Sequence, residues 1–216
     1  RALARRSGGG HEVIQFVRQN RHQPEVLSAF LSGGGGGGGV TARDAMLSVS
    51  GRLDRTYLGK SVPVYLSPHM IGRGRPKSGP MDGNGRRTIY IGVRRNFLSS
   101  MMLAFDMPQP LSTIGRRTSS NVPAQALIMM NDPFVVEQSR LWAKRILSIS
   151  IDSNADRIRA AYVTAFGRQP SNEEEQSADA FLQSQAKAHG EAKPGEKAWA
   201  DFCHVIFNVK EFIFLN

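Results

Sequence analysis

Three pairs of adjacent arginines near the middle of the sequence are the side chains best suited to chemistry. The pairs are Arg86-Arg87, Arg94-Arg95 and Arg116-Arg117. The planar guanidinium group binds carboxylate, phosphate or sulfate through two parallel hydrogen bonds. A helix that begins near Asn121 and includes Gln125 would add free backbone N–H groups and a positive dipole end. If the pairs converge, they form an anion site for a ligand such as a sulfated or uronic polysaccharide.

Acidic residues in the turns beside these arginines give the cluster an alternative role. Asp82, Asp106 and Asp132 would pair with the arginines and lock the loops, and Asp54 and Glu137 are further partners. A buried ion pair adds little net stability, but it fixes the geometry of the loops that it joins. Ligand binding and loop locking therefore remain open as two roles for one set of side chains.

A second basic motif is typical of nucleic-acid binding. Residues 73–76 read Arg-Gly-Arg-Pro, the core of the AT-hook that lays arginines in the narrow minor groove of A·T-rich DNA. The net charge of +10 suits a polyphosphate, but it suits sulfate, anionic glycans and lipid headgroups equally well. A four-residue match arises easily in a basic chain, so we expect nucleic-acid binding to be the weaker alternative.

Patterns for metal binding and catalysis are incomplete in this sequence. The stretch from Asp82 begins like a calcium loop, but Arg86 stands where a third oxygen ligand is required, which favours a tight Asx turn instead. His204 shares a helical stretch with Trp199 and Phe207, which favours a structural histidine. No nucleophile elbow accompanies the serines. We predict no metal site and no cofactor in this chain, and the question of enzymatic activity stays open.

The elements that must position these residues are mainly helices. Apolar spacing predicts helices over residues 41–50, 97–105, 123–130, 133–147, 156–166, 171–188 and 196–207. Asn96, Asp132-Pro133 and the Ser171/Glu174 capping box mark helix starts, and Gly51 and Gly167 mark helix ends. The fold class that follows is mainly α, a helical domain with long loops rich in Arg, Gly and Pro and one short β element.

The β element and the loops precede most of these helices. Residues 58–87 predict a long loop, and the alternation of Ile89, Ile91 and Val93 with polar residues and glycine predicts a strand. The glycine tract Gly33–Gly39 predicts a linker without regular structure. Residues 1–40 then form a glycine-linked appendage, and residues 41–216 form the domain.

The remaining composition limits the class of protein. Cys203 is the one cysteine, which excludes an internal disulfide, and its aromatic neighbours predict a buried thiol. No apolar run is long enough for a transmembrane helix, and no signal-peptide pattern occurs near Arg1. Since the chain begins without Met, a targeting signal would lie upstream.

Five ordered blocks of the sequence resemble a known family of unknown function. They are "RDAMLSVSGRLD", "GRGRPKSGPMDGNGRRTIYIGVRRNFLSSMMLAFDMP", "STIGRRTSSNVPAQALIMMNDPFVVEQSRLWAKRIL", "RIRAAYVTAFGRQPSNEE" and "WADFCHVIFNVKEFIFLN". Together they are similar to the C-terminal domain of large planctomycete-type proteins, the planctomycete-specific domain numbered 1553. The resemblance covers about residues 41–216. This sequence departs from the family in having polyglycine where a helix should run into Arg43-Asp44.

The resemblance implies a location and partners rather than a reaction. Members are similar to one another in being exported envelope proteins whose upstream portions include a cytochrome-c-like domain. It therefore implies a periplasmic or cell-envelope location, upstream domains of the same protein as partners, and haem c only in those upstream domains. It supplies no catalytic residues.

Three functions remain after these observations. The first is a non-catalytic accessory or scaffold domain that docks partner domains or an anionic glycan through an arginine-bearing face. The second is a part of a hydrolytic or redox enzyme whose site is shared with the upstream haem-bearing portion. The third is nucleic-acid binding through residues 73–76.

Overall fold

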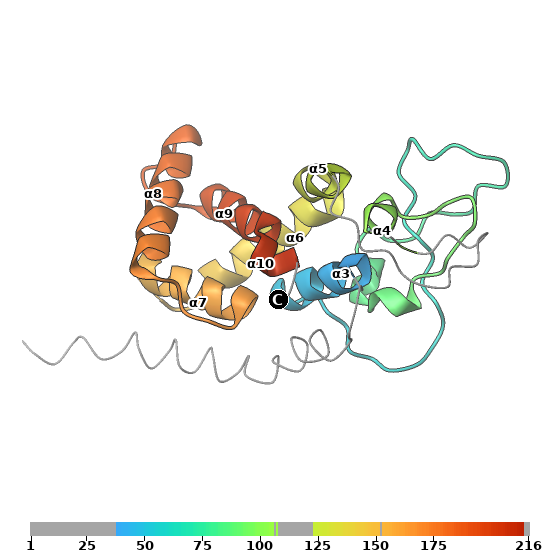
Figure 1. Cartoon of the computed structure of the whole chain (residues 1–216), viewed down its shortest axis with the longest axis horizontal. Helices are drawn as coiled ribbons and strands as arrows, with labels where there is room; N and C mark the ends of the chain where they lie inside the picture. The colour runs from blue at the N-terminus through green and yellow to red at the C-terminus, as the bar shows by residue number, and fades with distance from the viewer. Residues whose placement is uncertain (1–37, 106, 108–122, 152, 214–216) are drawn as a thin grey trace, which may run out of the picture.

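The computed structural model describes residues 38–105, 107, 123–151 and 153–213, and these residues are mainly helical, as predicted. Among them the regular elements are helices and short 3-10 turns, and no strand is formed. Figure 1 shows an elongated arrangement, with helices at one end and the loops of residues 51–98 at the other. No helix in the described ranges is both long and apolar enough to cross a membrane.

The first half of the described chain contains short elements. They are α3 (Gly38–Val49), the 3-10 turns η1 (Gly83–Gly85) and η2 (Thr88–Tyr90), and α4 (Ser100–Ala104). Because α3 begins at Gly38, the last two glycines of the tract are helical. The expectation that the whole tract lacks regular structure is therefore wrong at these two residues. Gly51 follows the helix with φ +78°, a conformation that favours glycine, and ends it as predicted.

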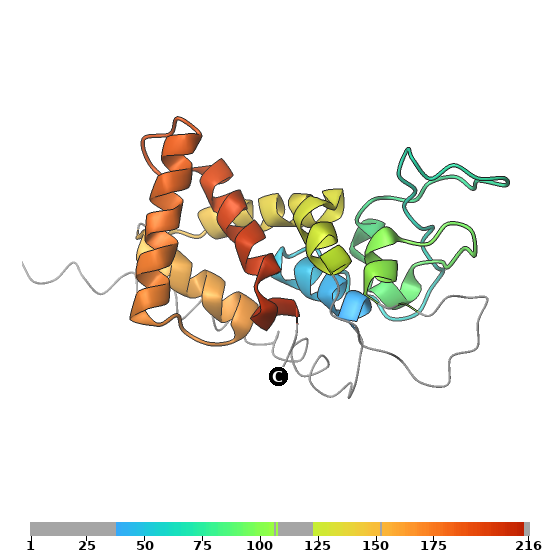
Figure 2. The ribbon, with the colours of Figure 1, turned by 45° about the horizontal axis from the view of Figure 1, so that its top comes forward.

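The second half contains the longer helices and most of the core. They are α5 (Pro123–Asn131), α6 (Pro133–Leu147), α7 (Asn154–Phe166), α8 (Asn172–Ala188), α9 (Glu196–Asn208) and α10 (Lys210–Ile213). Helices α6 and α9 lie side by side, and Trp142 of α6 stacks on Phe207 of α9 with ring centroids 5.2 Å apart (Figure 2). Cys203 is fully buried in this core, as predicted, and burial raises the pKa of its thiol. The central helices therefore form a rigid base for the rest of the chain.

Most of the predicted helix boundaries are confirmed by the capping geometry. Asp132 caps α6, since its carboxylate accepts a hydrogen bond from the backbone N–H of Phe134 at 2.9 Å. Ser171 and Glu174 form the predicted capping box, and Gly167 ends α7 with φ +72°. The predicted cap at Asn96 is wrong. Asn96 lies in a turn, and α4 is capped by Ser99, whose hydroxyl accepts from Met102.

The predicted strand over residues 89–93 is also wrong. Residues 88–90 form the turn η2, and Ile91 makes only an isolated parallel bridge with Val62. Ile89 and Val93 are 62% and 54% exposed, and only Ile91 packs against the small cluster of Val64, Leu66 and Phe97, so the alternating apolar residues do not share one buried face. A period-two pattern predicts a strand only where a neighbouring strand completes the ladder, and the described residues provide none.

A buried arginine and aspartate on α3 attach the loops to the helices. The Arg43 guanidinium donates to the carbonyl oxygens of Arg86 and Asp82 and to the Thr88 hydroxyl, at 3.0, 2.6 and 3.1 Å. The Asp44 carboxylate accepts from the backbone N–H and the hydroxyl of Thr88, at 2.7 and 2.6 Å. Both side chains are about nine-tenths buried. The pair therefore fixes residues 82–88 against the middle of α3.

A second arginine joins three helical elements at the opposite end. Arg168, after α7, forms paired hydrogen bonds of 2.8 Å to the Glu174 carboxylate. It forms another two, of 2.7 and 2.8 Å, to the Glu211 carboxylate of α10. The bonds from Arg168 to Glu174, together with the bond from the Ser171 backbone, lower the pKa of Glu174 to about 2. Arg168 therefore has a larger role than the turn residue that its sequence position suggests.

We expect Arg43→Met to lower the free energy of unfolding by about 3–5 kcal/mol, because it leaves the Asp44 carboxylate and two backbone carbonyls buried without their cation. Urea unfolding of the full chain measures the change. Arg140→Met is the matched control, because the Arg140 side chain is 62% exposed and its ion pair with Glu137 is long, at 3.9 Å. This variant should lower the free energy of unfolding by less than about 0.5 kcal/mol. Equal stability of the two variants would contradict the role of Arg43.

We expect Arg168→Met to cost about 1 kcal/mol at neutral pH, because the solvent-exposed bonds are screened. The folded-state pKa of Glu174 lies below its ordinary value near 4.5. Its pairing therefore stabilises the fold fully above that value and is lost as the pH falls toward 2. The gap in thermal stability between wild type and variant should narrow over this range. A gap that stays constant between pH 7 and pH 3 would exclude the Arg168 pair as its cause.

Candidate functional site

Residues 51–98, here called the loop segment, form the end of the molecule that lacks regular helices. A small apolar cluster of Val64, Leu66 and Phe97 lies at its centre. Backbone bonds from Val62 to the Tyr90 carbonyl and from Gly92 to the Val62 carbonyl, 2.8 and 2.7 Å long, connect its two sides. The loop segment is therefore held by specific bonds and a local core, although it contains no sheet.

The first turn of the loop segment is fixed by four side chains. Asp54 accepts from the backbone and hydroxyl of Thr56, at 2.9 and 2.5 Å. The Tyr90 hydroxyl accepts from the backbone N–H of Leu58 at 2.9 Å, and Arg86 donates to the Leu58 carbonyl at 2.6 Å. The Arg86 guanidinium lies over the Tyr90 ring, 4.1 Å from its centroid. The backbone N–H and the carbonyl of Leu58 are thus held by two side chains that stack on each other.

The turn holds Leu58 in a strained conformation. Its φ of +64° lies in the left-handed region, which costs a non-glycine residue about 1 kcal/mol. Leu58 is 64% exposed and Tyr57 is 79% exposed, so burial of these side chains does not offset the strain. The hydrogen bonds from Tyr90 and Arg86 hold the turn in place, and they present two large side chains to solvent.

Two further turns present basic side chains. Arg73 and Gly74 form the tip of one turn, in which Gly74 has φ +72° and the Arg75 side chain donates to the Ser67 carbonyl at 3.1 Å. The other turn comprises residues 94–97. The turns are neighbours, because a Cβ added at Gly72 would lie 3.1 Å from the Phe97 ring. The loop that carries the turn of Arg73 and Gly74, teal in Figure 2, extends away from the helices.

The two arginine pairs that the structure describes have different surroundings. Arg86 lies 4.0 Å from Asp54 and Arg87 lies 3.5 Å from Asp44, so the first pair makes internal contacts. Arg94 and Arg95 are exposed. Arg116, Arg117 and Asn121 lie outside the described residues, as does Asp106, and Gln125 is buried on α5. Within the described ranges the first and second pairs therefore have different environments.

The predicted carboxylates are placed in turns and at a cap. Asp82 accepts from the backbone N–H of Asn84 at 2.9 Å, which is the predicted Asx turn, and its other oxygen lies 3.0 Å from Arg52. Asp132 caps α6, and burial raises the pKa of its carboxyl. His204 contacts the Met129 carbonyl at 2.9 Å, which suits a structural histidine.

Two residues that shape this end of the molecule were not predicted from the sequence. Arg43 was missed, although it lies three and four positions before the buried Met46 and Leu47 on α3. A charged residue on an apolar helix face is a signal for a buried, bonded group. Tyr57 was also not predicted, and no local pattern marks it, because the turn that carries it is held by bonds from the distant Arg86 and Tyr90 to the neighbouring Leu58.

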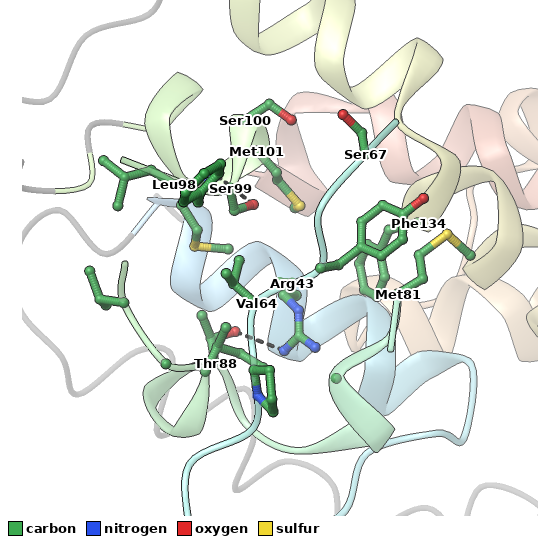
Figure 3. A pocket seen from close by; sticks show the side chains of 18 of the residues that line it. Arg43, Val64, Ser67, Met81, Thr88, Leu98, Ser99, Ser100, Met101 and Phe134 are labelled. Carbon is green, nitrogen blue, oxygen red and sulfur yellow. Dashed lines mark hydrogen bonds between the residues drawn. The ribbon is translucent and has the colours of Figure 1, made fainter. Parts of the chain in front are cut away.

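An apolar cavity of about 270 Å³ lies between the loop segment and the helices, with Arg43 in its wall (Figure 3). Its lining includes five methionines, Phe97 and Phe134. Asp132 is the one carboxylate among the described residues that line it, and no histidine, lysine or cysteine joins it there. The cavity can hold an apolar group, but it does not bring a nucleophile and a base together. No cluster of metal-ligating side chains occurs in the part of the chain that the structure describes.

Comparison with known proteins gives one match. A family model described as "PSD1: Protein of unknown function (DUF1553)" matches residues 40–182, a range that includes most of α3, the loop segment and the helices through most of α8. No curated protein matches the chain, and no solved structure does. Because the match covers more than half of the sequence and contains both the Arg43-Asp44 pair and the exposed basic turns, this chain belongs to the DUF1553 family of proteins of unknown function.

Proposed function

We propose that this chain is a non-catalytic binding domain that holds an anionic polysaccharide on the exposed basic turns of the loop segment. The single observation that carries the proposal is the distribution of charge. Residues 51–98 contain ten Lys and Arg against two Asp, whereas residues 99–216 contain twelve basic against thirteen acidic side chains. Because the excess is concentrated at one end of the molecule, it attracts a polyanion to that end.

Most of these cations are free to contact a ligand. Arg52, Arg86 and Arg87 pair with aspartates. The others are exposed and make no ion pair with a described residue, and we call them the seven unpaired cations: Arg55, Lys60, Arg73, Arg75, Lys77, Arg94 and Arg95. A polymer that carries regularly spaced sulfates or carboxylates can engage several of them at once, which favours a polysaccharide over a small anion.

The conformation of residues 73–76 argues for a glycan rather than duplex DNA. Minor-groove binding by this motif needs an extended segment whose arginines enter the groove. Here Arg73 and Gly74 form a turn, and the Arg75 side chain is bonded to the Ser67 carbonyl. Arginines on a turn suit the surface groups of a flexible chain. The cavity chemistry described above supports binding rather than catalysis, and an exported location and docking of upstream domains stay part of the proposal.

We expect the full chain to bind dextran sulfate and not neutral dextran, with affinity that falls as salt rises, because bound polymer releases its counterions. Arg94→Ala/Arg95→Ala should weaken binding about five- to tenfold and reduce the salt slope by about 1–2. Lys187→Ala/Lys193→Ala is the matched control. It removes the same charge near the end of α8, far from the loop segment, and should leave the affinity unchanged. Fluorescence anisotropy with labelled polymer measures each affinity.

Three results would overturn the proposal. They are equal binding to neutral dextran, equal loss of affinity in the two double variants, and tighter binding to an A·T-rich duplex than to dextran sulfate at about 0.15 M salt. The last result would assign the basic turns to nucleic acid.

A further inference from the structure

The turn of residues 54–60 carries an exposed aromatic ring between two of the unpaired cations. Tyr57 is 79% exposed, and Arg55 and Lys60 lie two and three residues away on the same turn. The other tyrosines have different surroundings: Tyr90 lies beneath Arg86, Tyr65 lines the cavity, and Tyr162 packs on Phe166. Tyr57 is therefore the tyrosine that the described structure offers to a ligand.

Hydrogen bonds on both sides of Tyr57 hold the backbone of the turn that carries its ring. Leu58 keeps its left-handed conformation because Tyr90 and Arg86 hold its N–H and its carbonyl. Asp54 fixes the preceding Thr56. Strain that is held in place without burial of the side chain is typical of binding loops. A tyrosine on such a turn has little backbone freedom to lose on binding, so its contact area contributes efficiently to affinity.

We infer that Tyr57 is a sugar-stacking residue that lets the loop segment select a sulfated or uronic polysaccharide over other polyanions. The electron-rich face of the ring packs against the C–H groups of a pyranose ring. Arg55 and Lys60 then lie within reach of the sulfate or carboxylate groups on the same or the next sugar. The inference rests on the proposed function, because it names the polymer that the unpaired cations hold.

Two other partners fit this turn less well. Tyr57 and Leu58 would also enter an anionic membrane surface, but they are only two side chains, and such binding grows with the apolar area buried. Single-stranded nucleic acid also stacks on aromatic rings, but it uses several successive rings along a basic groove. Tyr57 is the single strongly exposed aromatic ring among the described residues.

The test compares dextran sulfate with inorganic polyphosphate, a polyanion without rings, using the full chain. We expect Tyr57→Ala to weaken binding of dextran sulfate at least fivefold and to change binding of polyphosphate less than twofold. Tyr57→Phe should keep the affinity of wild type for both, because it keeps the ring. In NMR spectra, the ring protons of Tyr57 should shift upon titration with dextran sulfate, and those of Tyr65, Tyr90 and Tyr162 should not.

Each other outcome has a defined meaning. Unchanged binding of dextran sulfate by Tyr57→Ala overturns the role of Tyr57 and leaves the proposed function in place. Absence of binding to dextran sulfate by wild type overturns both. Tighter binding to anionic phospholipid vesicles or to single-stranded DNA than to dextran sulfate, lost in Tyr57→Ala, overturns the polysaccharide as the partner of this turn.

Discussion

The interaction on which the rest of the structure depends is the buried pair of Arg43 and Asp44. Two charges removed from water are tolerated only if their donors and acceptors find partners, and here those partners are the backbone and hydroxyl groups of residues 82–88. If residues 82–88 moved away, both buried charges would lose these hydrogen-bond partners, so the pair holds the loop in place. A helix of twelve residues thereby fixes a segment that lies 39 to 45 residues later in the sequence than the bonded side chains.

The loop segment shows how irregular backbone is held without a sheet. Its carbonyls and N–H groups bond to side chains where a ladder would otherwise satisfy them, and Arg86, Tyr90 and Asp54 are used in this way. The cost is strain at Leu58. The consequence is that Tyr57 and the seven unpaired cations face solvent on turns of defined shape, although Arg75 also bonds the Ser67 carbonyl. This combination of internal arginine contacts and exposed arginines explains why charge alone does not separate the two roles.

The helical half has the opposite character. Its charges nearly cancel, and its exposed ion pairs, such as that of Arg159 with Glu175, lie within or between neighbouring helices. Its stability comes from the packing of α6 against α9 and from the Arg168 bonds that join α10 to the start of α8. The helices supply a rigid base, and the excess charge is carried by the loops. The division suits a domain whose binding surface is separate from its core.

The sequence by itself determined the elements whose causes are local. Asp132 before Pro133, Ser171 three residues before Glu174, and Gly167 after an apolar stripe each specify a helix boundary within a few residues, and the structure has them as predicted. Burial of Cys203 followed from its aromatic neighbours on one helix face. The mainly helical fold and the family were equally accessible, since both depend on patterns that are read along the chain.

Only the tertiary structure decided which residues meet across long separations. The strand expected at residues 89–93 does not form: Thr88 bonds to Asp44, 44 residues earlier, and among the described residues Ile91 makes only a single bridge, with Val62. Arg86 likewise contacts residues far away in the sequence, since its partners are Asp54 and the Leu58 carbonyl. The turn that carries Tyr57 is held by these contacts and by the Tyr90 hydroxyl. Loop closure over such distances is set by the whole fold rather than by local propensity, so the shape of the candidate site could not be predicted from its residues alone.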